Sequence, residues 1–167
     1  MSAARYKPLR GVSLLVLATS VLLVGFGPRS TASTSSQSGE IELMMQKFLA
    51  AFSNRDVEAF TAYFAEDASM FFPPSAFSPP ASLVEGRTNI AAAFRGLYER
   101  TGPRRTPANP IQPQDMRVKT FDGSAVVTFH LGSDSVRGRR TFVLRRTGAE
   151  WTIVHLHSST LESQRAR

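Results

Sequence analysis

Apolar residues along this chain first follow the period of a helix and later that of a strand. Over residues 40–54, EIELMMQKFLAAFSN, they recur three or four positions apart: Ile41, Met44, Met45, Phe48, Leu49 and Phe52. This spacing places them on one face of an amphipathic helix. Two shorter helices are expected after it, at 56–64 with Asp56 as the cap and at 89–100 with Thr88 as the cap.

The second half of the chain alternates between apolar and polar residues, which is typical of β-strands. Strands are expected at 68–72, 116–121, 124–131, 139–146 and 151–159. Asp122-Gly123 supplies the tight turn of a hairpin between the second and third of these. Proline-rich stretches at 73–85 and 101–113 are expected to be loops. Three helices followed by antiparallel strands predict an α+β fold with the helices on one sheet face.

Neither face of the predicted strands consists only of charged side chains, as a face exposed to solvent would. In 124–131 the two faces are Ala125, Val127, Phe129 and Leu131 against Ser124, Val126, Thr128 and His130. In 151–159 strict alternation groups Trp151, Ile153, His155 and His157 against Thr152, Val154, Leu156 and Ser158. A sheet that is partly apolar on both sides must cover both. We therefore expect helices on one face and a second copy of the chain on the other, which makes a homodimer.

The first 32 residues have the pattern of a signal peptide. Arg5, Lys7 and Arg10 precede a stretch without charge, and the small residues Ser30 and Ala32 form a cleavage motif. We expect cleavage after Ala32 and export to the periplasm or beyond the cell. A flexible Ser/Thr-rich linker at 33–39, one domain at 40–160 and a tail at 161–167 would follow, with no membrane contact after cleavage. The alternative is an uncleaved N-terminal membrane anchor.

Charge and cysteine content exclude several classes of function. The chain has 20 Lys and Arg against 13 Asp and Glu, a net charge of +7. Four of the basic residues lie before residue 33 with no acidic residue, so the mature net charge is only +3. The arginines of 137–146 alternate between two strand faces, so no nucleic-acid partner is expected. The absence of cysteine excludes disulfides, thiolate metal sites and a cysteine nucleophile.

Four segments resemble the SnoaL-like branch of the nuclear transport factor 2 superfamily: FLAAFSNRDVEAFTAYFAEDASMFF, VEGRTNIAAAF, DGSAVVTFHL and RRTGAEWTIVHLHSS. The resemblance spans residues 40–160 and is closest to the association domain of calcium/calmodulin-dependent protein kinase II. It implies a cone-shaped fold, with three N-terminal helices packed on a strongly curved, mainly antiparallel sheet. It also implies a pocket inside the cone and dimerisation through the sheet.

The resemblance also indicates what the pocket would contain. Ketosteroid isomerases would need an acid near Phe72 and a tyrosine near 45–48, and this chain has neither. His130, Thr141 and Ser158 stand where the kinase association domains carry arginines, with Arg117 as a remaining cation. A neutral, mostly aromatic pocket suits a small, largely apolar ligand. Its expected lining is Phe72, Phe94, Tyr98, Arg117, His130, Thr141 and Ser158.

The histidines leave the question of catalysis open. His155 and His157 are two residues apart on one strand and could begin a metal site with His130. No inward acid completes such a site, so no metal or other cofactor is expected. His130 is the candidate general base. Three functions remain: a ligand-binding domain without catalysis, a lyase or isomerase that acts through His130 on a cyclic or polyketide-like substrate, and an association module without a ligand.

Overall fold

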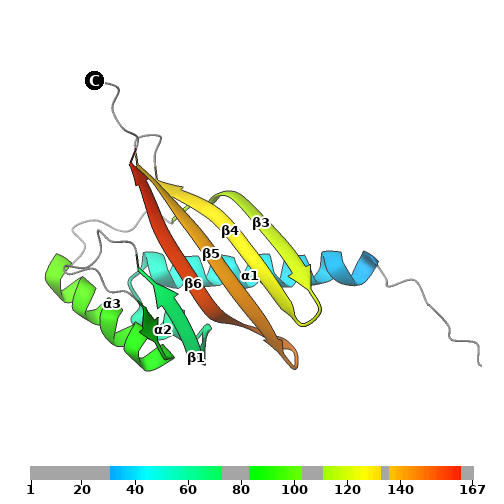
Figure 1. Ribbon diagram of the computed structural model, residues 1–167, viewed down its shortest axis with the longest axis horizontal. Coiled ribbons are helices and arrows are strands. Elements are labelled where there is room, and N and C mark those ends of the chain that lie inside the picture. Colours follow the sequence, from blue (N-terminus) through cyan, green and yellow to red (C-terminus); the bar gives the residue numbers. More distant parts are fainter. Residues whose placement is uncertain (1–30, 73–82, 103–110, 133–135, 163–167) are drawn as a thin grey trace, which may run out of the picture.

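The computed structural model describes residues 31–72, 83–102, 111–132 and 136–162 (Figure 1). The helices are α1 (Thr31–Ser53), α2 (Val57–Thr61) and α3 (Arg87–Thr101). The strands are β1 (Phe64–Phe71), β2 (Val84–Glu85), β3 (Gln114–Phe121), β4 (Ser124–Gly132), β5 (Val136–Thr147) and β6 (Glu150–Glu162). Most of the predicted signal peptide, parts of both proline-rich loops and the end of the C-terminal tail lie outside the described residues.

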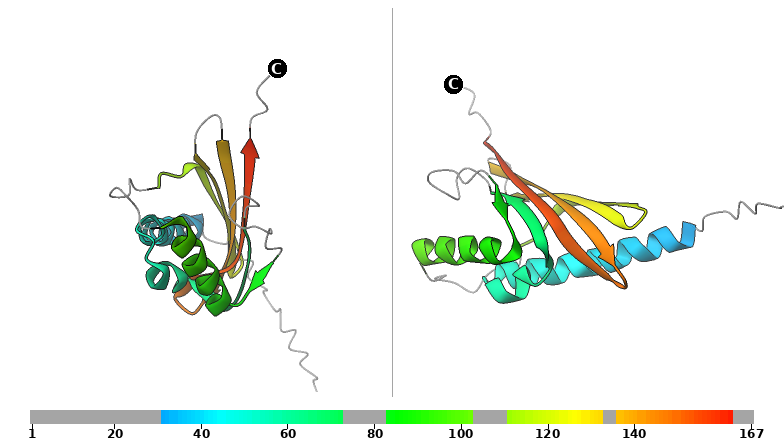
Figure 2. Two further views of the ribbon diagram at one scale, coloured as in Figure 1. Left: turned by 90° about the vertical axis from the view of Figure 1, so that its left-hand side faces the viewer. Right: turned by 60° about the horizontal axis from the view of Figure 1, so that its bottom comes forward.

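The six strands form one sheet in the order β2-β1-β6-β5-β4-β3. Strands β3 to β6 pair antiparallel with their neighbours, and β1 runs parallel to β6. All three helices lie on one side of this twisted sheet, and among the described residues no helix covers the other side (Figure 2). We call the side toward the helices the inner face and the opposite side the outer face. The predicted α+β class and the cone with its N-terminal helices are confirmed.

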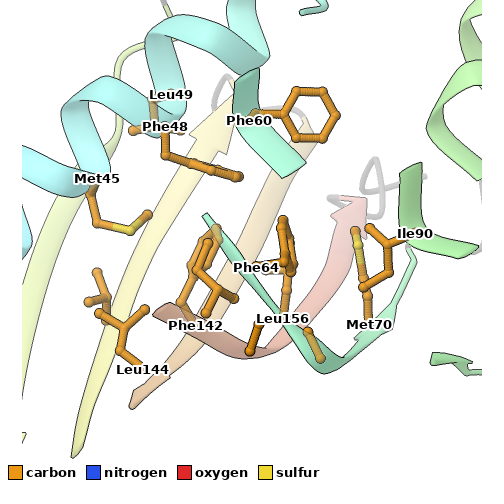
Figure 3. Close-up of a cluster of buried hydrophobic side chains, with 14 of the residues drawn as sticks. Met45, Phe48, Leu49, Phe60, Phe64, Met70, Ile90, Phe142, Leu144 and Leu156 are labelled. Atoms are coloured by element: carbon orange, nitrogen blue, oxygen red, sulfur yellow. The ribbon is translucent and has the colours of Figure 1, made fainter. Parts of the chain in front are cut away.

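Aromatic rings join the helices to the inner face. Figure 3 shows side chains of the three helices and of β1, β5 and β6 pointing toward one another. The ring of Phe48 on α1 lies 5.4 Å from that of Phe142 on β5, and 6.1 Å from those of Phe60 and Phe64. All four side chains are at most 3% exposed. Such edge-to-face contacts add to the hydrophobic stabilisation of the core.

Helix α1 begins earlier than the sequence predicted. Residues 33–39, expected to form a flexible linker, belong to α1, which starts at Thr31. The apolar pattern could not mark this part of the helix because its residues are polar or glycine. A helix that is already anchored by packed residues extends at little cost per residue. The signal peptide and the cleavage after Ala32 stay predictions. No helix of the described residues is both long and apolar enough to cross a membrane.

Element ends depend on local capping. Asp56 caps α2 as predicted, because its Oδ1 accepts a hydrogen bond of 3.0 Å from the backbone N–H of Ala59. Helix α3 starts from Gly86 instead of the predicted cap Thr88. Gly86 has a φ of 86°, which glycine adopts without strain. Strand β1 begins at Phe64, earlier than expected, so this residue belongs to the sheet and not to a helix.

A β-bulge interrupts the alternation of β6. On β5 the neighbours Val143 and Leu144 pair with His155 and Ile153, so Val154 is an extra residue in β6. One extra residue moves every later side chain of a strand to the opposite face. The bulge therefore reverses the faces in the second half of β6.

The reversal changes which residues of β6 face the helices. Leu156 and Ser158 are buried on the inner face, with 4% exposure each. His155 and His157 pair with residues of the outer face and are half-buried and exposed, respectively. Strict alternation, which grouped both histidines with the buried Trp151, is therefore wrong.

Candidate functional site

A cavity of about 200 Å³ lies between the inner face of the sheet and helices α1 and α3. Its apolar lining is Phe48, Leu49, Phe52, Met70, Phe72, Phe94, Leu97, Phe129, Leu131, Phe142 and Leu156. Within the described parts of the chain, its polar lining residues are Arg140 and Ser158. Ligand cavities in proteins commonly measure about 300–1,000 Å³, so this cavity lies below that range and has room only for a small molecule.

Strand register places the two polar residues side by side. Arg140 on β5 pairs with Phe129 on β4 and with Ser158 on β6, so the three form one row across the inner face. Ser158 faces inward only because of the bulge at Val154, which lies between it and the start of β6. The row gives one side of an otherwise apolar cavity a guanidinium and a hydroxyl group.

The guanidinium of Arg140 is held by backbone carbonyl groups. Its Nη1 donates hydrogen bonds to the oxygens of Arg139 at 2.9 Å and of Ser159 at 3.2 Å. Among the described residues no carboxylate lies within ion-pair distance of this guanidinium. Burial lowers the pKa of Arg140 from its usual value, because removal of water disfavours the charged form. Arg140 nevertheless stays cationic near neutral pH, since arginine ionises far above it.

Three of the predicted site residues line this cavity. They are Phe72, Phe94 and Ser158. Tyr98 lies beside it: its ring is 6.0 Å from that of Phe94, and the guanidinium of Arg55 stacks 4.9 Å from its centre. The structure therefore places these four residues near one another.

The other three predicted residues lie on the outer face. Thr141 pairs with Thr128 and His157 there, and Arg117 pairs with Thr128 and is exposed. His130 also points to the outer face, because its neighbours along β4, Phe129 and Leu131, both line the cavity. Alternation along a strand predicts which residues share a face, but not which of the two faces meets the helices.

His130 has a carboxylate neighbour outside the cavity. Its Nδ1 lies 3.6 Å from Oδ2 of Asp115, which has a φ of 55° at an irregularity between β3 and β4. This distance is longer than that of a hydrogen bond. Because His130 faces away from the cavity, it cannot act on a molecule bound there without a change of the fold.

The described residues that line the cavity offer no group suited to proton transfer. They include no carboxylate, imidazole or phenol. A general base must reach the proton that it removes, directly or through one water. Phe48 and Phe72 stand near the positions where the sequence comparison expected the tyrosine and the acid of a ketosteroid isomerase. Both are buried lining residues.

The two histidines of β6 make local contacts on the outer face. Nδ1 of His155 lies 2.8 Å from Oγ of Ser69 on β1, and the rings of both histidines lie within 5.8 Å of Phe71. Burial, and then the neighbouring His157, lower the pKa of His155. In the described parts of the chain, no three His, Asp or Glu side chains lie close enough together to bind a metal ion.

Sequence reasoning missed Arg140, which is the charged residue of the cavity. A signal for it existed, since Arg140 has the same alternation as Phe142 and Leu144, the apolar residues of its strand. An arginine that shares the alternation of core residues along a strand lies on the same sheet face as the core. The family resemblance pointed to Thr141 instead, which strand pairing places on the outer face.

Comparisons with known proteins support the fold. The model of the SnoaL-like domain matches residues 41–162. An NTF2-like protein of unknown function from Pseudomonas putida KT2440 is similar in structure, with a TM-score of 0.60 and 21% identity over 82% of this chain and 99% of that protein. No curated protein matches the chain.

Two further solved structures share this architecture. A cystatin-like protein of unknown function from Nostoc punctiforme PCC 73102 has a TM-score of 0.59 and 13% identity, over 77% of this chain and 94% of its own. The CamKII hub homology domain of Chlamydamonas reinhardtii has a TM-score of 0.56 and 21% identity, over 75% of this chain and 98% of its own. At these identities the structures show the fold alone. The match of the family model over residues 41–162 establishes that this chain belongs to the SnoaL-like domain family.

Proposed function

We propose that this domain binds a small, largely apolar molecule that carries one anionic group, and that it does so without catalysis. The observation that carries the proposal is Arg140, a partly buried cation at the wall of an apolar cavity with no carboxylate partner among the described residues. A cation removed from water is costly unless a counter-charge is near. A carboxylate on the ligand would supply that charge and accept hydrogen bonds from the guanidinium.

The remaining lining defines the body of the ligand. Rings of Phe72, Phe94 and Phe129 face a cavity of about 200 Å³, which fits a short aliphatic chain or a single aromatic ring. The hydroxyl group of Ser158 lies in the same row as Arg140 and can donate to the second carboxylate oxygen. A monocarboxylic acid with one ring or a short chain is therefore the proposed class of ligand.

Binding without turnover is the simplest use of such a cavity. Among the described residues, its lining offers a cation and a hydroxyl group but no base to activate that hydroxyl group. The lyase or isomerase alternative requires His130 in the cavity, and His130 faces outward. The association module without a ligand would leave the charge of Arg140 without a carboxylate partner among the described residues. These observations favour the ligand-binding function.

Calorimetric titration with matched ligands tests the proposal. Phenylacetate and hexanoate are compared with phenylacetamide and hexanol, which keep the apolar body and remove the charge. We expect the acids to bind about 10- to 100-fold more tightly, because hydrogen bonds to charged groups contribute roughly 1.5–3 kcal/mol. Arg140→Met should abolish this preference. Arg95→Met, which removes an exposed arginine of α3, should retain it.

Two results would contradict the proposal. One is equal affinity for the acids and their neutral analogues. The other is chemical conversion of a bound ligand at a rate that falls when His130 is replaced by glutamine, since this would restore the enzymatic alternative.

We also propose that two copies associate through the outer face of the sheet. The support is the composition of this face, where half-buried Val126 and Val143 and exposed Phe71 have no covering element among the described residues. Exposed apolar area of this kind is typical of interaction sites. Sedimentation near neutral pH should give twice the mass of one chain, and a monomer at all concentrations would refute the dimer.

Export remains the proposed localisation. It rests on the charge and hydropathy pattern of residues 1–32. Cell fractionation followed by intact-mass measurement should find a product shortened at Ala32 outside the cytoplasm. A full-length product in the cytoplasm would refute the proposal, and a full-length product in the membrane fraction would support the anchor alternative.

A further inference from the structure

The outer face has a neutral centre surrounded by charged side chains. Its central residues are Phe71, Val126, Thr128, Thr141, Val143, His155 and His157. Its charged and other titratable groups are Glu85, Asp67 paired with Arg145, Arg137, Arg139, His130 beside Asp115, Arg117 and Lys119. A centre depleted of charge inside a polar rim is the usual composition of a protein interface.

One row across this face begins with a cation and ends with an anion. Strand pairing gives the row as Lys119, Val126, Val143, His155, Ser69 and Glu85. Lys119 lies on β3 and Glu85 on β2, which are the two edge strands. Val143 on β5 and His155 on β6 form the middle of the row and of the sheet.

We propose that the two copies meet about a two-fold axis that runs parallel to the strands, between β5 and β6. This inference rests on the dimer proposed above and adds its geometry. Rotation about such an axis lays β3 of each copy over β2 of the other and leaves positions along the strands unchanged. Lys119 of each copy then lies on the same side of the axis as Glu85 of the second copy and at the same height along the strands. An axis across the strands would instead stack β3 on β3 and bring like charges together.

The same axis brings the β6 histidines of both copies together at the centre of the interface, which we call the seam. His155 and His157 lie on a strand beside the axis, so their imidazoles enter the interface near those of the second copy. His155 is already half-buried against Ser69 within one copy. In the two rows that hold these histidines, the described residues include one carboxylate, Glu85 at the sheet edge. Protonation of the imidazoles therefore places uncompensated positive charge in the seam and weakens association.

Charge reversal tests the position of the axis. The dimer would contain two equivalent Lys119–Glu85 pairs. Lys119→Glu or Glu85→Lys alone makes both pairs like-charged and should raise the dissociation constant of the dimer about 3- to 10-fold. The double variant restores opposite charges and should return to within about twofold of the parent. Lys47→Glu on α1 makes the same charge change away from this face and serves as the control.

A pH series tests the position of the histidines. Between about pH 7.5 and 5.5 the dissociation constant should rise at least about tenfold in the parent. The double variant His155→Gln and His157→Gln should stay dimeric and lose most of this dependence. His130→Gln, which removes an imidazole from the rim of the same face, should keep it.

The outcomes distinguish failure of the proposed axis from failure of the proposed dimer. A parent that is monomeric near pH 7.5 overturns both the dimer and its proposed geometry. A dimer in which the two charge reversals add instead of cancelling overturns the axis alone. A dimer whose pH dependence survives in the double glutamine variant overturns the placement of the histidines at the axis.

Discussion

The guanidinium of Arg140 lies directly against Gly138, two residues earlier on the same face of β5. A methyl group on Gly138 would come within 3.0 Å of Nη1 and 3.3 Å of Nη2 of Arg140. These contacts are tighter than most contacts of a real Cβ atom, so the guanidinium would have to move by a few tenths of an ångström. Gly138 thus leaves the space in which the charged end of Arg140 rests at the cavity wall.

Gly138→Ala should weaken anion binding without unfolding the domain. The group in contact is the flexible end of a side chain, which can shift by a few tenths of an ångström. We expect the affinity for phenylacetate to fall several-fold and the free energy of unfolding to change by less than about 1 kcal/mol. Calorimetry and urea denaturation measure the two quantities. A large loss of stability with unchanged affinity would show that Arg140 does not rest against this residue.

Arg140→Met should stabilise the unliganded domain. The change removes a partly buried cation that has no carboxylate partner among the described residues and adds apolar contact with the cavity wall. We expect the free energy of unfolding to rise by roughly 1 kcal/mol. Urea denaturation measures it, with Arg95→Met as the comparison. A decrease would mean that the hydrogen bonds to the carbonyl groups of Arg139 and Ser159 outweigh the burial of the charge.

Phe142→Ala should be strongly destabilising. Phe142 is 2% exposed, and its ring lies 5.4 Å from that of Phe48 and 5.5 Å from that of Phe129. Its removal opens a void between α1 and the sheet and should lower the free energy of unfolding by about 3–5 kcal/mol. Phe121→Ala is the matched control, because Phe121 is 49% exposed and should change stability by less than about 1 kcal/mol. Similar losses for both variants would contradict this packing.

Gly123→Ala should destabilise the hairpin between β3 and β4. Gly123 has a φ of 67°, in the left-handed region that alanine adopts with strain. We expect a loss of about 1 kcal/mol in the free energy of unfolding. Asp122→Ala, at the preceding position of the turn, should lose less. An unchanged midpoint of denaturation for Gly123→Ala would show that the turn tolerates a side chain.

The carboxyl group of Asp67 should titrate below its usual range. Arg145 donates hydrogen bonds to both of its oxygens, at 2.9 and 3.3 Å, and thereby lowers the pKa of Asp67. Because the folded-state pKa is depressed, any stabilisation by this pair is present above the unfolded pKa and is lost as pH falls through the folded value. NMR titration of Asp67 should show its pKa rising in Arg145→Gln. The same pKa in both proteins would contradict the contact.

The elements of this fold could be predicted because they depend on short-range patterns. The apolar spacing of residues 41–52 requires a helix, and the alternation after Gln114 together with Asp122-Gly123 requires a hairpin. The polar start of α1 could not be predicted in the same way. Its helical conformation follows from attachment to the packed part of the helix and leaves no hydrophobic signal.

The content of the cavity was only partly predictable. Phe94 follows from the apolar spacing of its helix and Phe72 from the family resemblance. His130, Thr141 and Arg117 were assigned to the wrong face, and Arg140 was missed. The alternation of a strand is symmetric between its two faces, so the sequence pattern alone does not say which face meets the helices. Packing of α1 against the sheet breaks that symmetry.

The sequence by itself determined the class of fold, its family and the order of its elements, except the short strand β2 within the predicted loop 73–85. Tertiary structure decided which groups share the cavity. The bulge at Val154 shows the physical reason: one extra residue, with no signal of its own, turns Ser158 inward beside Arg140 and turns His155 outward. Such a shift depends on hydrogen bonds between strands that are distant in the chain, and only the folded sheet contains them.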